Sequence, residues 1–116
     1  MTPDDFRRLA LSQPGAKEVL RRGHSDFRVL RKAFASLEGS ADSVATVQLT
    51  PEQQAMFMHA APRTFVPVTG GWGRLGATNV VLTCAKEAIV KSALAAAWRN
   101  IAPKSLLEST DESQAS

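Results

Sequence analysis

The sequence predicts a single domain of the α+β class, and three observations carry this prediction. Short runs in which apolar and polar residues alternate indicate β-strands. Two threonine-proline signatures indicate helix starts, and a long apolar stripe close to the C-terminus indicates an amphipathic helix. A chain of 116 residues can bury one core without disulfides or metals. We therefore expect one domain over residues 1–104 and a polar, mostly disordered tail over residues 105–116.

The first half of the chain reads as one helix followed by strands. Thr2 is a good helix cap, Pro3 fits the first turn, and the helix must end before Pro14. Val19 begins the first predicted strand. The runs 26–30, 33–37 and 44–49 alternate as strands do, and they place Phe27 on the buried side.

The second half repeats this logic. Thr50 and Gln53 have the spacing of a reciprocal capping box, which predicts a helix that ends before Pro62. Residues 78–83 are rich in β-branched side chains and predict a strand. The last helix has apolar residues at helical spacing up to residue 101, and Pro103 closes it.

Positive charge is unevenly distributed. Residues 1–104 hold 14 basic and 8 acidic residues, a net charge of +6, and six of the basic residues lie within residues 17–32. Clustered cations attract polyanions, although an ordinary solvated face can have the same composition. The single cysteine, the absence of a signal-peptide pattern and the lack of a long apolar run predict a cytoplasmic protein without membrane contact.

Residues 71–76 match the glycine spacing of a dinucleotide-binding loop. That loop needs a helix after the glycines and an acid about 20 residues further on. Here a strand-like run follows, and alanines occupy positions 95–97. We therefore expect no nucleotide cofactor. The glycines instead predict a tight hairpin turn with Trp72 and Arg74 at its exposed tip.

No catalytic or metal site is predicted. The run His24-Ser25-Asp26 contains the residue types of a serine hydrolase, but an extended chain points Ser25 away from both neighbours. His24, His59 and Cys84 lack the spacing of metal ligands. The sequence thus predicts a protein that is not an enzyme and needs no metal or other cofactor.

Several segments resemble the MmcQ/YjbR-like family between residues 3 and 104. They are "DFRVLRKAFASL", "VQLTPEQQAMF", "FVPVTGGWGRLGATNVVL" and "AAWRNIAP". The resemblance implies a compact two-layer sandwich like that of frataxin and CyaY, with helices on one face of an antiparallel sheet. It also implies double-wing DNA binding. Two positions depart from the family pattern, because Ser25 replaces a usual proline and Arg31 a usual glycine, which predicts a different turn around Arg31.

These observations together predict weak, largely non-specific binding to DNA. We expect the protein to be a monomer and not an oligomer. Phosphate contacts of this kind give affinity without sequence information. One wing would supply Arg28, Arg31 and Lys32, the other would supply Trp72 and Arg74, and Arg21 and Arg22 would extend the patch.

Two alternatives remain open. The basic hairpins could dock an acidic protein partner in a regulatory module. A cleft near residues 70–76 could instead hold an anionic small molecule, with His24, Arg28 and Arg74 converging on it.

Overall fold

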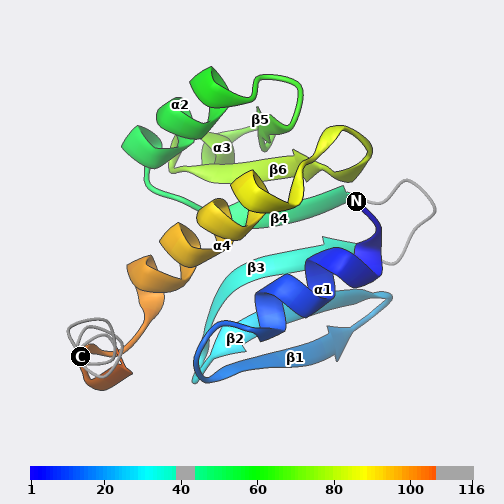
Figure 1. Ribbon diagram of the computed structural model, residues 1–116. Helices are drawn as coiled ribbons and strands as arrows, with labels where there is room; N and C mark the ends of the chain where they lie inside the picture. Colours follow the sequence, from blue (N-terminus) through cyan, green and yellow to red (C-terminus); the bar gives the residue numbers. More distant parts are fainter. Residues whose placement is uncertain (39–43, 107–116) are drawn as a thin grey trace.

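A six-stranded antiparallel sheet forms the centre of the molecule, with strand order β1-β2-β3-β4-β6-β5 (Figure 1). The computed structural model describes residues 1–38 and 44–106, so most of the predicted tail lies outside the described residues. The strands are β1 (Ala16–Arg21), β2 (His24–Val29), β3 (Lys32–Glu38), β4 (Val44–Gln48), β5 (Phe65–Pro67) and β6 (Ala77–Val81). The helices are α1 (Pro3–Leu11), α2 (Pro51–Ala60), the four-residue α3 (Gly71–Arg74), the 3₁₀ turn η1 (Leu82–Cys84) and α4 (Glu87–Ile101).

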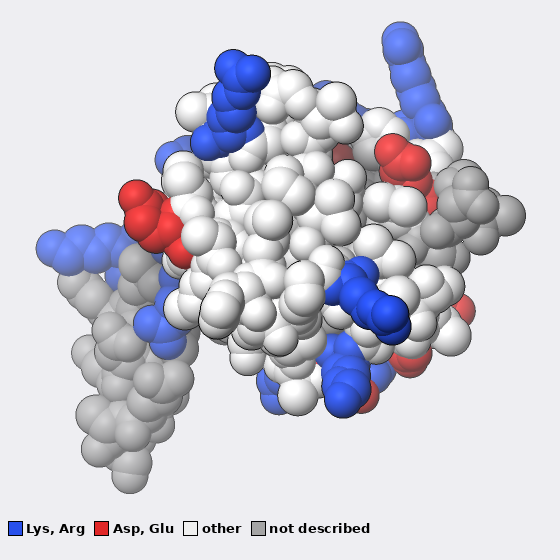
Figure 2. All heavy atoms as spheres, turned by 90° about the horizontal axis from the view of Figure 1, so that it is seen from above, with Lys and Arg blue, Asp and Glu red and all other residues white. Residues whose placement is uncertain are grey.

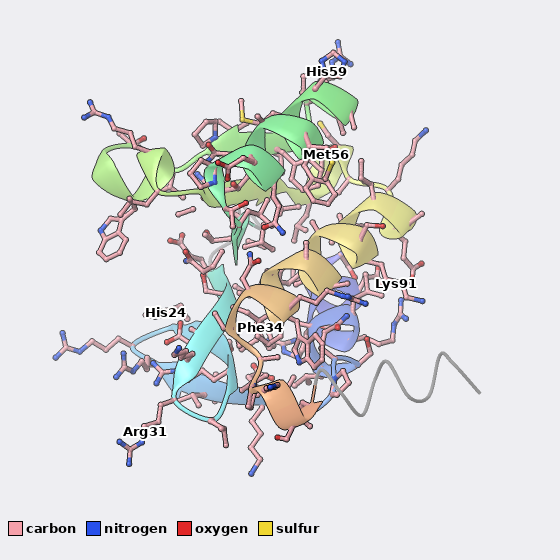
Figure 3. All side chains as sticks on the ribbon, turned by 90° about the vertical axis from the view of Figure 1, so that its left-hand side faces the viewer. His24, Arg31, Phe34, Met56, His59 and Lys91 are labelled. Carbon is pink, nitrogen blue, oxygen red and sulfur yellow. The ribbon has the colours of Figure 1, made fainter. Side chains whose placement is uncertain are left out.

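Helices α1 and α4 lie side by side on one face of the sheet (Figure 1). The ring of Phe6 meets that of Phe27 edge-on, with centroids 6.0 Å apart. Trp98 of α4 is buried, and its Nε1 donates a hydrogen bond of 2.8 Å to the carbonyl oxygen of Pro14. Figure 3 shows Phe34 pointing between the sheet and these helices. The α+β sandwich predicted from the sequence is confirmed.

Both predicted threonine caps are present, and Thr2 forms a reciprocal capping box as Thr50 was predicted to do. The Thr2 side chain accepts from the backbone of Asp5, and the Thr2 N–H donates to the Asp5 carboxylate. This backbone hydrogen bond lowers the pKa of Asp5, so the carboxylate stays charged at the positive end of the helix dipole. Thr50 and Gln53 form the same reciprocal pair at the start of α2.

Alternation along the strands divides the sheet into two faces. In β2, Ser25, Phe27 and Val29 are buried beneath the helices, whereas His24 and Arg28 point the other way. We call the face opposite α1 and α4 the open face. Its side chains come from every second position of β1, β2, β3, β4 and β6.

The turn around Arg31 differs from the expectation for that position. The residue with left-handed backbone is Leu30, with φ of 56°, and Arg31 has no positive φ. A non-glycine residue in this region is uncommon, and the strain of the turn falls on Leu30. The turn therefore places Arg31 at its outer corner without straining Arg31 itself.

No helix within residues 1–38 and 44–106 is long and apolar enough to cross a membrane.

Candidate nucleic-acid interface

The antiparallel register brings two separate segments to one end of the sheet. The β2–β3 turn joins the end of β2 to the start of β3, and β4 ends opposite the start of β6. Because α3 directly precedes β6, α3 and the β2–β3 turn lie at the same end, on the left in Figure 1. We call this region, residues 30–32 and 71–75, the wing end. In the sheet, β6 lies two strand spacings from β3 and three from β2, with about 4.8 Å per spacing.

The first part of the wing end is the β2–β3 turn. Leu30, Arg31 and Lys32 are all exposed, and Figure 3 shows Arg31 projecting away from the body of the protein. The turn borders an apolar hollow of about 540 Å³, closed on its other side by Ile101 and Pro103. Within the described part of the chain, neither cation forms an ion pair. The guanidinium group of Arg31 and the ammonium group of Lys32 are therefore available to an anion.

The second part is α3, and here the prediction of a tight hairpin turn is wrong. Residues 71–74 form one helical turn between the antiparallel strands β5 and β6. A side chain at Gly73 would place its Cβ 1.8 Å from the carbonyl oxygen of Val68, and one at Gly76 would come within 1.9 Å of that of Leu49. The glycines thus allow the backbone to approach two strand ends closely, which a hairpin would not require.

A side chain from α2 further fixes this turn. The Gln54 amide nitrogen lies within hydrogen-bond distance of the Gly73 carbonyl oxygen (2.9 Å), the Ala77 carbonyl oxygen (3.1 Å) and the Thr78 hydroxyl (3.2 Å). These contacts anchor the chain after Trp72, at Gly73 and at the start of β6. The exposed residues of α3 are consequently held on a rigid support.

Trp72 and Arg74 are exposed, as the sequence predicted. Trp72 is 71% exposed, so its ring does not cover the hydrophobic core. It borders a hollow of about 400 Å³ on the open face, over β4 and β6. Among the described residues, the polar part of its lining comes from Glu38, Thr46, Gln48, Thr69 and Asn79, of which Glu38 alone is charged.

Arg28 lies on the open face two residues before the β2–β3 turn, but an acid engages its side chain. Its guanidinium is 3.0 Å from Asp26, and His24 lies 3.5 Å from the same carboxylate. The carboxylate neutralises much of the Arg28 charge, so Arg28 is a weaker phosphate ligand than the sequence suggested. The sequence places Asp26 and Arg28 two residues apart in a strand, and this spacing was the available signal for the pair.

Arg21 and Arg22 are exposed in the β1–β2 turn, at the opposite end of the sheet. The six residues of β2 separate this turn from Arg31, which corresponds to about 20 Å at 3.3 Å per residue. The structure therefore does not bring Arg21 and Arg22 into one patch with the wing end.

The structure does not gather His24, Arg28 and Arg74 into one cleft. His24 and Arg28 flank Asp26 on β2, whereas Arg74 belongs to α3, which packs on β6 three strand positions away. The described residues that line the hollow beside α3 include Glu38 and no lysine or arginine, so they offer an anion no cation.

The serine between His24 and Asp26 points into the protein, as predicted. Ser25 is buried, and its hydroxyl donates a hydrogen bond of 2.5 Å to Glu18. It therefore cannot act as a nucleophile assisted by its neighbours. Across residues 1–38 and 44–106, no three of the side chains His, Cys, Asp and Glu lie close enough to hold a metal ion.

Ion pairs occupy many of the acidic groups and few of the cations. Arg7 and Arg8 of α1 take up four carboxylates, and Arg28 takes up a fifth; these are Asp4, Asp5, Glu18, Glu87 and Asp26. The hydrogen bond from Arg8 to Glu87 also raises the pKa of the arginine. The exposed cations of the sheet turns therefore face solvent with few acids beside them, which makes the local potential positive.

The surface over α2 offers no comparable cluster. Figure 2, which looks down on this surface, shows mostly uncharged atoms with lysines and arginines near the margins. In Figure 3, Met56 and His59 lie on α2, remote from Arg31. A phosphate ligand would be attracted to the edges of the sheet and not to α2.

The sequence matches no protein-family model and no curated protein. Among solved structures, the chain is similar to Deinococcus radiodurans protein DR2400, which carries family-model domain DUF419. The two share 18% sequence identity, and the match covers 90% of this chain and 80% of that chain with a TM-score of 0.70. The protein therefore has the fold of a domain found in that protein.

Proposed function

We propose that the protein binds nucleic acid weakly and largely without sequence preference, through phosphate contacts at the wing end. The observation that carries this proposal is that Arg31 and Lys32 lie at the same end of the sheet as Arg74, which comes about 40 residues later in the chain. Exposed cations on two separate segments suit a linear polyanion better than a compact anion. We expect binding, not catalysis, to be the activity.

We also infer that the chain is a divergent MmcQ/YjbR-like protein that works in the cytoplasm. Two of the quoted segments, residues 26–37 and 65–82, include the β2–β3 turn and α3 of the wing end, and the other two fall on β4, α2 and α4. The likeness to a DUF419 domain is compatible with this family. The single free cysteine suits a reducing compartment.

The salt dependence of binding to duplex DNA tests this proposal. If Arg31, Lys32 and Arg74 each meet one phosphate, the slope of log K against log salt should be about −2.7, from roughly −0.9 per contact. Participation of Arg21 and Arg22 would steepen it to about −4.5. Affinity at physiological salt should be about 10⁻⁴–10⁻⁶ M. Fluorescence anisotropy with a labelled duplex measures both quantities, and absence of binding at low salt would refute the proposal.

A further inference from the structure

Trp72 presents a large aromatic ring to solvent from a rigid support. Its relative exposure is 71%, whereas the other tryptophan, Trp98, is 1% exposed in the core. Close packing at Gly73 and the hydrogen bonds from Gln54 hold the turn in place. An exposed ring on a fixed support loses little conformational entropy when a flat ligand stacks on it.

The hollow beside the ring offers neutral hydrogen-bonding groups. The Thr46 hydroxyl donates to Asn79 Oδ1 at 3.1 Å, which fixes the amide and leaves its NH₂ group for a ligand. The side-chain amide of Gln48 has no hydrogen-bond partner among the described residues, and Asn100 holds the Gln48 backbone carbonyl at 3.1 Å. Amide side chains of this kind pair with the edges of nucleobases.

We propose that this hollow takes one unpaired nucleobase, stacked on Trp72 and hydrogen-bonded to Gln48 and Asn79. The inference rests on the proposed function, because the wing-end cations would hold the phosphates of the same strand. A volume of about 400 Å³ is within the range of small-ligand pockets. Among the described residues the lining includes no lysine or arginine, which suits a neutral base better than a phosphate.

Proximity to the cations favours a nucleobase over a neutral sugar, which also stacks on tryptophan. Arg74 lies two residues after Trp72 on the same helical turn, and both are exposed. Residues at this spacing project from different sides of a helical turn, so a strand whose base enters the hollow would pass around α3 for its phosphates to reach the Arg74 guanidinium. The protein should consequently prefer single-stranded segments to duplexes of equal charge, because duplex bases are paired and stacked.

An abasic oligonucleotide separates base contacts from phosphate contacts. Wild-type protein should bind a single strand of about ten nucleotides roughly 5- to 150-fold more tightly than an abasic strand with the same phosphates. Trp72→Ala should abolish this difference and leave affinity for the abasic strand unchanged. Met56→Ala is the matched control, because Met56 of α2 is 59% exposed, lies outside the wing end and does not line the hollow. A thermal melt of each variant confirms folding.

The outcomes distinguish this inference from the proposed function. Equal binding of both strands by wild type overturns the base site and leaves phosphate binding standing. If neither strand binds, the proposed function fails. In that case, free adenosine and cytidine test the hollow without phosphates. Quenching of Trp72 fluorescence by either nucleoside supports the base site, and no quenching overturns the base site. Quenching by maltohexaose but not by either nucleoside also overturns it.

Discussion

Replacing Gly73 with alanine is expected to lower the free energy of unfolding by about 3 kcal/mol, the upper part of the usual range for overpacking. The new Cβ would lie 1.8 Å from the carbonyl oxygen of Val68, so the backbone must move. That movement would also strain the contacts of Gln54 with the Gly73 and Ala77 carbonyls. Denaturant unfolding followed by circular dichroism measures the loss.

Gly71→Ala provides the matched control within the same helical turn. A Cβ at Gly71 would meet nothing within 4 Å, and its φ is not positive. Alanine there should stabilise the protein by about 0.4–1 kcal/mol, because it restricts the unfolded chain. Opposite signs for the two substitutions are expected. A Gly73→Ala variant as stable as Gly71→Ala would show that α3 does not pack against the Val68 carbonyl.

Reversing the charge of Arg31 and Lys32 to glutamate is expected to weaken binding to duplex DNA at least about tenfold at physiological salt. Two phosphate contacts are lost and two repulsive charges replace them. Both side chains are exposed, so the free energy of unfolding should change by less than about 0.5 kcal/mol. Anisotropy titrations compare the variant with the parent.

The pair Arg21→Glu and Arg22→Glu is the control for net charge. It changes the total charge by the same amount, but the positions lie about 20 Å from Arg31 along β2. Long-range attraction should fall equally in both double variants, whereas direct contacts are removed only at the wing end. Equal losses in the two variants would mean that net charge alone drives binding.

Signals confined to a few neighbouring residues made much of the fold predictable. The helix starts at Thr2 and Thr50 could be predicted because a threonine cap and its partner lie within four residues of each other. The buried side of β2 followed from alternation, which depends only on position along the strand. The stripe through Leu94 and Trp98 likewise needs only the helical period.

Features that depend on distant contacts were not predictable in the same way. Gly73 of α3 and Gly76 just after it are needed because the carbonyl groups of Val68 and Leu49 approach them closely. Leu49 lies 27 residues before Gly76 in the chain. The hollow under Trp72 requires β4 and β6 to be neighbours, a strand order that alternation cannot reveal. The separation of Arg21 from Arg31, by contrast, depends only on the length of β2 between them.

Chemical-shift mapping of the backbone amides during a titration with duplex DNA tests the proposed interface most directly. We expect the shifted amide signals to cluster at residues 30–32 and 71–75, with little change at Arg21, Arg22 and Gly23. The shifts should shrink as salt is raised, because counterion release drives the contacts. Shifts concentrated at the β1–β2 turn or on α2, or no shifts at low salt, would contradict it.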